Sequence, residues 1–183
     1  GPQDETRHTY ISKIAVFDPS SNQFLATGSG GLQGVSELRN GRYGHSSVLL
    51  PSGQDVLVVG GYSGNRVIRE FEVISLLDSQ MTVSTPTIAG SQSGVGPIFH
   101  AATVTPSGQV LLSGGYDSVA EAAPQGVVPT GASRNVEVWD YIPNRNELQR
   151  LCNDTMQEGR GFHTVSSVGN QAYFVGGRLT DGI

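Results

Sequence analysis

Residues 98–115 read IFHAATVTPSGQVLLSGG, which is a histidine, a short apolar run, a tight polar turn, a second apolar run and a glycine pair. The first run follows His100, the turn is Pro106-Ser107-Gly108-Gln109, and the second run, Val110 to Ser113, ends at Gly114-Gly115. A Pro- and Gly-containing turn between two apolar runs is typical of a β-hairpin. The stretch therefore predicts an antiparallel hairpin that a histidine opens and a glycine pair closes.

Two further copies of this hairpin flank the first. One runs from His45 through Pro51-Ser52-Gly53-Gln54 to Gly60-Gly61, and the other from His163 through Val168-Gly169-Asn170-Gln171 to Gly176-Gly177. The histidines are 55 and 63 residues apart, and the glycine pairs are 54 and 62 residues apart. Because the two markers drift together, the extra residues fall outside the hairpin, as an internal repeat requires.

A second hairpin follows the glycine pairs, most clearly at Val136–Asp140 and Glu147–Leu151. The chain also opens on such a unit, with Ile14–Asp18 leading through a polar turn to Gln23–Ala26. Two hairpins make four strands in about 50 residues, which is the size of a β-propeller blade. The fold is therefore predicted to be all-β, with three four-stranded blade equivalents.

These features resemble the kelch repeat family, whose blades carry an arginine and a histidine before the first strand, a double glycine after the second and an aromatic-Asp pair in the third. Arg42 to His45 and Arg160 to His163 keep the first feature, whereas Gly96-Pro97 replaces the arginine before His100 and Ile74-Ser75 replaces the aromatic-Asp pair. The resemblance implies a kelch-type β-propeller. The residues assigned to the structural repeat are His45, His100, His163, Gly60, Gly61, Gly114, Gly115, Gly176, Gly177, Trp139, Asp18 and Asp140.

The repeats divide the chain unevenly. Gly1-Pro2 is interpreted as the scar of a removed tag, and residues 3–183 as the propeller segment. Within it, 3–40 would form the third and fourth strands of a split blade, 41–95 and 96–158 two whole blades, and 159–183 the first two strands of the split blade. Closed propellers have about four to eight blades. We therefore expect a second copy to complete the split blade in trans, giving a six-bladed homodimer; the alternative is a fragment of a longer kelch protein.

Composition excludes several classes of partner. The net charge of the 183 residues is −5, and Lys13 is the only lysine, so no basic tract would neutralise a nucleic-acid backbone. No apolar run is long enough for membrane insertion. The single cysteine, Cys152, cannot form an internal disulfide, and no cysteine spacing suggests a metal site. No cofactor or metal is expected, and neither an extracellular nor a cytoplasmic location follows from the sequence.

The long connections predict a recognition surface. They run from Gly28 to Gly41, Tyr62 to Arg69, Thr85 to Pro97, Tyr116 to Arg134, Asn153 to Gly161 and from Arg178 onward. In an up-and-down blade they leave from one end, and loops on a rigid scaffold commonly carry binding function. Exposed aromatic and arginine side chains there are the candidate contacts for a protein or carbohydrate. They are Tyr43, Tyr62, Arg66, Tyr116, Arg160, Phe162 and Arg178.

Two other hypotheses stay open. The first is a kelch-like carbohydrate-active enzyme, either galactose-oxidase-like or a sugar epimerase. A copper oxidase of that kind needs a tyrosine cross-linked to a cysteine and two histidines, yet Cys152 is the sole cysteine and the repeat accounts for three of the four histidines. The second is a purely architectural half-propeller. We expect no catalytic residues and favour a non-enzymatic binding scaffold.

Overall fold

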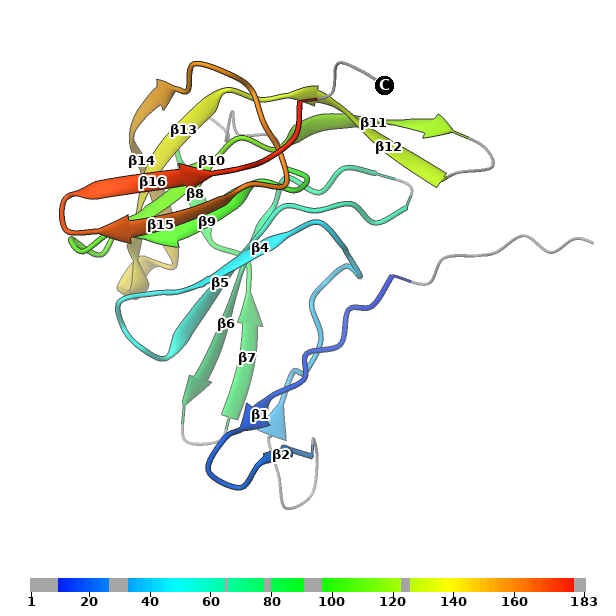
Figure 1. Ribbon diagram of the computed structural model, residues 1–183. Helices are drawn as coiled ribbons and strands as arrows, with labels where there is room; N and C mark the ends of the chain where they lie inside the picture. The colour runs from blue at the N-terminus through cyan, green and yellow to red at the C-terminus, as the bar shows by residue number, and fades with distance from the viewer. Residues whose placement is uncertain are drawn as a thin grey trace, which may run out of the picture.

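The computed structural model describes residues 10–26, 33–64, 66–77, 80–90, 97–122 and 126–179, so Gly1-Pro2 lie outside it. In this part of the chain the fold is all-β, as predicted: strands and one short 3-10 helix occur, and α-helices do not. The strands form several sheets, none of which closes on itself (Figure 1). No helix in the described ranges has the length and hydrophobicity to span a membrane.

Two five-stranded sheets form the body of the molecule. The first has the order β3-β7-β6-β5-β4, and the second β8-β14-β13-β10-β9. The strands of the first are β3 (Gln33–Gly34), β4 (Ser46–Leu49), β5 (Asp55–Val59), β6 (Phe71–Leu77) and β7 (Gln80–Ser84). Those of the second are β8 (Thr87–Ala89), β9 (Ala101–Val104), β10 (Val110–Ser113), β13 (Asn135–Ile142) and β14 (Glu147–Thr155).

Each of these sheets is a four-stranded antiparallel meander with one added parallel strand. The meanders run β4 to β7 and β9-β10-β13-β14, while β3 lies parallel to β7 and β8 parallel to β14 on the outer edge. The added strands come from connections that the sequence suggested were loops. Each therefore ties the connection before a meander to that meander's outer strand.

Three hairpins form two-stranded sheets of their own. They are β1 (Phe17–Asp18) with β2 (Gln23–Phe24), β11 (Tyr116–Ala122) with β12 (Gly126–Ala132), and β15 (Thr164–Val168) with β16 (Gln171–Val175). The β1-β2 hairpin and the β15-β16 hairpin lie far apart, on opposite sides of the two large sheets (Figure 1). The four strands assigned to the split blade thus do not meet within one chain.

The β11-β12 hairpin corrects the expectation of a loop from Tyr116 to Arg134. Its strands pair from Tyr116 opposite Ala132 to Ala122 opposite Gly126. Ser118 Oγ lies 2.7 Å from Thr130 Oγ1 across the pair. Small and β-branched side chains suit such a ribbon, which projects beyond the large sheets (Figure 1).

The core lies between the two large sheets. Phe71 of β6 and Trp139 of β13 have ring centroids 5.4 Å apart, and both side chains are buried. Burying one such side chain contributes roughly 1.5–3 kcal/mol. The core residues are Leu50, Leu57, Val59, Phe71, Val73, Val110, Leu112, Trp139 and Leu148.

The inner strands β4, β9 and β15 lie next to one another, and a backbone ladder joins the residues just before them. Phe99 N–H donates to the Gly44 carbonyl (2.7 Å), and Phe162 N–H donates to the Phe99 carbonyl (2.9 Å). All three residues have positive φ, between 55° and 67°, a conformation that costs the two phenylalanines some strain. Because the same bond recurs between the residues before β4 and β9 and between those before β9 and β15, each hairpin is placed on the preceding one in the same way.

The glycine pairs make a second set of repeated contacts. Gly61 N–H donates to the Pro97 carbonyl (2.7 Å), and Gly115 N–H donates to the Arg160 carbonyl (2.8 Å). A Cβ atom at the first glycine of either pair would lie 2.3 Å or less from the same carbonyl oxygen. Glycine is therefore required where each hairpin meets the next.

Candidate functional site

Six aromatic side chains form one continuous row, which we call the aromatic cluster. It lies at the end of the sheets where the long connections enter and leave. Three members directly precede or lie close before β4, β9 and β15, and two follow the glycine pairs. The members are Tyr10, Tyr43, Tyr62, Phe99, Tyr116 and Phe162.

Ring contacts run through the whole cluster. Tyr10 stacks on Tyr43 with centroids 5.5 Å apart, and Tyr43 meets Phe99 edge-on at 5.8 Å. Phe99 stacks on Phe162 at 4.0 Å, and Phe162 lies 5.7 Å from Tyr116. Such pairs add about 0.5–1.5 kcal/mol each beyond area burial. The six rings therefore form one continuous, mutually packed aromatic layer.

Backbone bridges hold the cluster in place. Tyr43 and Tyr62 exchange N–H···O bonds of 3.1 and 2.9 Å. The same bridge recurs between Ile98 and Tyr116, and between Gly161 and Arg178. Arg178 thus stands where the first two repeats carry tyrosines, at the end of the cluster.

Two candidate residues are less exposed than the sequence suggested. Tyr62 and Tyr116 are only 5% and 1% exposed, whereas Phe162 is 50% exposed. The reason is local: Gly161 has no side chain, and a Cβ there would lie 2.1 Å from the Tyr116 ring. Tyr62 and Tyr116 therefore lie beneath the surface, whereas the side chain of Phe162 is accessible to a ligand.

The hydroxyls of the two buried tyrosines donate to backbone carbonyls. Tyr62 Oη donates to the Gly64 carbonyl at 2.9 Å, and Tyr116 Oη donates to the Arg178 carbonyl at 2.7 Å. Desolvation raises the pKa of Tyr43 and of Tyr116, so both phenols stay protonated at neutral pH. The hydroxyls of Tyr62 and Tyr116 are therefore already engaged within the chain, and Tyr43 and Tyr116 carry no negative charge.

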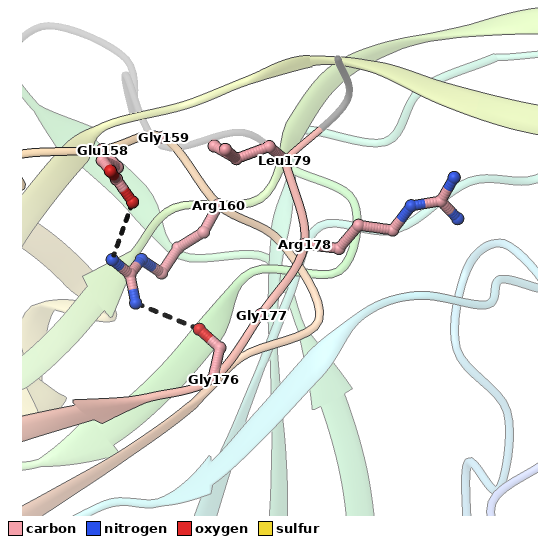
Figure 2. Close-up of a pocket in the computed structure, with 7 residues that line it drawn as sticks. All are labelled: Glu158, Gly159, Arg160, Gly176, Gly177, Arg178 and Leu179. Atoms are coloured by element: carbon pink, nitrogen blue, oxygen red, sulfur yellow. Dashed lines mark hydrogen bonds and ion pairs between the residues drawn. The ribbon is translucent and has the colours of Figure 1, made fainter. Parts of the chain in front are cut away.

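The three candidate arginines are placed differently. Arg66 pairs with Glu70 through Nη1 and Oε1 at 2.9 Å, and both side chains are exposed. Arg160 donates from Nη1 to the Gly176 carbonyl (3.0 Å) and has Nη2 3.9 Å from Glu158 Oε2. Arg178 is exposed, and its side chain points away from Arg160 (Figure 2). Of the three, Arg178 contacts a member of the aromatic cluster directly, because its carbonyl accepts the Tyr116 hydroxyl.

A hollow of about 340 Å³ lies beside the third glycine pair. Residues 158–160 and 176–179 line it, and Figure 2 shows Arg160 bridging its floor between Glu158 and Gly176. Its lining includes three charged residues, Glu158, Arg160 and Arg178. Arg160 already donates to the Gly176 carbonyl and lies near Glu158, so the side chains of this hollow are partly engaged with one another.

The repeated histidines differ in environment. His100 and His163 are buried; His100 Nδ1 lies 3.2 Å from the Pro97 carbonyl, and His163 Nε2 lies 2.7 Å from Ser113 Oγ. Desolvation lowers the pKa of His163 and lowers that of His100 to about 4. Both are therefore neutral at pH 7. His45, at the same register, is exposed.

The described residues do not bring together the ligands that a metal site requires. No group of three or more His, Cys, Asp or Glu side chains there lies close enough to hold a metal ion. Cys152 is an exposed free thiol on β14.

Two members of the cluster were missed by sequence reasoning. Phe99 precedes His100 as Phe162 precedes His163, so the repeat itself carried the signal. Tyr10 had no such signal, because it lies before the first recognised strand.

Comparison with models of known protein families and with curated protein sequences finds no match for this chain.

Proposed function

We propose that this chain is a segment of a kelch-type β-propeller that serves as a non-enzymatic scaffold for binding another protein. The observation that carries the proposal is the aromatic cluster, with Phe162 half exposed and Arg178 beside it. Aromatic and arginine side chains supply most of the hot spots in protein interfaces. A rigid aromatic surface loses little side-chain entropy on binding.

The arrangement of the sheets supports the propeller part of the proposal. Two antiparallel meanders of four strands and two half-meanders follow in chain order, with their first strands β4, β9 and β15 adjacent. The two sets of repeated backbone contacts favour a common rotation from one unit to the next. Blades around a central axis would have this relation.

A carbohydrate ligand is the second candidate. The stacked rings of Phe99 and Phe162 favour it, since a flat ring face can also pack against a sugar. The protein ligand is preferred because the surface is a long row rather than a pocket with convergent polar groups.

The test is selection with two libraries, phage-displayed peptides and an immobilised glycan array, against the whole chain and two variants. We expect the chain to enrich a peptide motif and Phe162→Ala to bind it at least tenfold more weakly. Phe24→Ala is the matched control, because Phe24 is an exposed phenylalanine of the distant β1-β2 hairpin. Enrichment on glycans alone would replace the protein ligand with a carbohydrate. No saturable binding in either library, or full binding by Phe162→Ala, would contradict the proposal.

A further inference from the structure

We propose that the open edges of this chain bind a second copy of the chain, so that the segment Ile14–Asp18 of one copy, which contains β1, pairs with β16 of the other. The inference rests on the proposed propeller and names the partner that completes it. Two such junctions, related by a two-fold axis, would close a ring of six repeats.

The third glycine pair lacks the neighbour that covers the first two. A Cβ at Gly60 or Gly114 would meet a carbonyl oxygen of the next repeat at 2.3 or 2.2 Å, and a histidine ring close by. A Cβ at Gly176, which has a similar φ of +72°, would meet no described atom within 4 Å. The hollow of Figure 2 lies at this position. The position at Gly176, which we call the open seat, is therefore free to accept the carbonyl and histidine of a following repeat.

The other edge of the chain carries the group that would fill this seat. His100 packs on Gly60 and His163 packs on Gly114, and both histidines are buried. His45, which stands at the same register, is exposed. In the second copy, His45 would cover Gly176 as the other two histidines cover their glycines.

Backbone donors and acceptors at the two edges match. The ladder that runs from Gly44 to Phe99 to Phe162 ends, among the described residues, on a Gly44 N–H and a Phe162 carbonyl without a bond. The glycine contacts likewise end on the Gly177 N–H and the Arg42 carbonyl. One added junction would join both pairs, Gly44 N–H to Phe162 and Gly177 N–H to Arg42, in the directions seen inside the chain.

The segment Ile14–Asp18 occupies the position that β13 has in the second large sheet, but no described strand lies where β10 would pair with it. Arg42 N–H donates to the Ile11 carbonyl as Arg160 N–H donates to Ser133 (3.3 and 3.1 Å). Leu38 N–H donates to Ser12 as Met156 N–H donates to Arg134 (2.8 and 2.7 Å). These bonds make Ile14 the counterpart of Val136, the β13 residue opposite Ser113 of β10.

The same register predicts the new strand pair. In the third repeat, β16 corresponds to β10, with Val175 at the place of Ser113. Ile14 of the second copy would then face Val175, and Val16 would face Tyr173. Val16 O accepts from Leu25 N–H, and Ile14 N–H donates to Ser36 O, on the hairpin's own side. Alternate residues of a strand point to opposite edges, so Ala15 and Phe17 present their backbone groups to the open one.

Exposed apolar side chains mark both edges. Phe17 is 46% exposed, whereas Trp139, its counterpart in β13, is fully buried. Exposed large apolar residues gather on the two edges, and uncovered strand edges with such residues favour association. They are Ile11, Phe17, Phe24, Leu25 and Leu49 on one edge, and Val168, Tyr173, Val175 and Leu179 on the other.

The first test is the mass in solution of the whole chain over a hundredfold range of concentration. We expect a particle of twice 19.3 kDa that dissociates on dilution. Gly176→Ala should weaken the dimer at least tenfold, because the methyl group would occupy the seat of the second copy. Gly169→Ala is the matched control: it also has positive φ and no described atom within 4 Å, but it lies in the β15-β16 turn. Equal effects of the two substitutions would overturn the proposal.

The second test is a disulfide between copies. In the double variant Val16→Cys, Tyr173→Cys, with Cys152→Ala, the paired Cα atoms would be about 4.5 Å apart, within disulfide range. We expect a covalent dimer on a non-reducing gel. Ile11→Cys with Tyr173→Cys, five residues out of register, should give none. A chain that is monomeric throughout and forms no such disulfide would overturn the second copy and favour further repeats of a longer chain. If that monomer binds peptide, the proposed function stands and the second-copy junction fails. If the chain is a dimer that binds no ligand in either library, the junction stands and the proposed function fails.

Discussion

Arg42 and Glu72 form an ion pair that is closed to solvent: Arg42 Nη2 donates to Glu72 Oε1, and both side chains are buried. Arg42 Nη1 also donates to the Gly60 carbonyl (3.0 Å), and Glu72 Oε2 accepts the Arg39 N–H (2.9 Å). Burial lowers the pKa of Arg42 to about 10, so the guanidinium stays charged at neutral pH. The pair joins the loop before β4 to β6.

Removing Arg42 should be costly, because it strands a buried carboxylate. Arg42→Met is expected to lower the free energy of unfolding by about 3–5 kcal/mol. Urea denaturation followed by circular dichroism measures it. The double variant Arg42→Met, Glu72→Leu should recover most of the loss; if it is as unstable as the single variant, the unpaired charge is not the cause.

The first glycine of a repeated pair should not tolerate a side chain. Gly60→Ala places a Cβ 2.3 Å from the Pro97 carbonyl at φ +66°. Backbone strain and overpacking together should cost on the order of 2–4 kcal/mol. Gly53→Ala is the control in the same denaturation series, because Gly53 has φ +72° and open space. A similar loss in both would show that φ alone matters.

Acid should destabilise the fold through His100. Its pKa is lowered from 6.5 to about 4, chiefly by desolvation. Below pH 6.5 the His100 imidazole is protonated in the unfolded chain, but in the folded chain it stays neutral until about pH 4. The free energy of unfolding therefore falls as the pH drops across this window. The full effect is on the order of 3 kcal/mol. His100→Gln should flatten the dependence of unfolding free energy on pH between 6.5 and 4; an unchanged slope would assign it to other groups.

Trp139 gives a local probe of the core. Its Nε1 donates to Glu137 Oε2 at 3.0 Å, and Glu137 also pairs with Arg150 at 3.0 Å. Trp139→Phe loses this bond to a charged acceptor and should cost about 2 kcal/mol in urea denaturation. Glu137→Gln measured alone and together with Trp139→Phe completes the cycle. Strictly additive losses would show that the two side chains do not interact.

The β11-β12 hairpin should be dispensable for folding. Replacing residues 119–129 with Asn-Gly retains Ser118, Thr130 and the buried Tyr116. Because the hairpin pairs only with itself among the described strands, the melting temperature should change by less than about 4 °C. Scanning calorimetry measures this. A larger fall would mean that the ribbon supports the sheets.

The hairpins between histidine and glycine pair were predictable because each combines two short apolar runs with a tight turn that contains Pro and Gly, or Gly and Asn. The second strand predicted at Val110 to Ser113 is confirmed as β10. The edge strands β3 and β8 were not predictable, since segments of two and three residues carry no period and pair only because a meander lies beside them.

Four of the seven candidate residues lie together in the structure, but the sequence did not show how deeply each is buried. Tyr43, Tyr62, Tyr116 and Phe162 do come together, because the repeat puts them at one end. Which of them is buried depends on tertiary neighbours, such as Gly161 beneath Tyr116, that no local pattern reveals.

The ladder Gly44–Phe99–Phe162 has a direction: each N–H donates to the preceding repeat and never to the following one. Contacts with this polarity are heterologous, so a chain that uses them can grow head to tail into a filament as readily as it can close. In the proposed dimer, closure would win because the second junction forms within one particle, at a high effective concentration. A substitution that changes the angle between repeats, while leaving every contact intact, should therefore turn a discrete assembly into fibres.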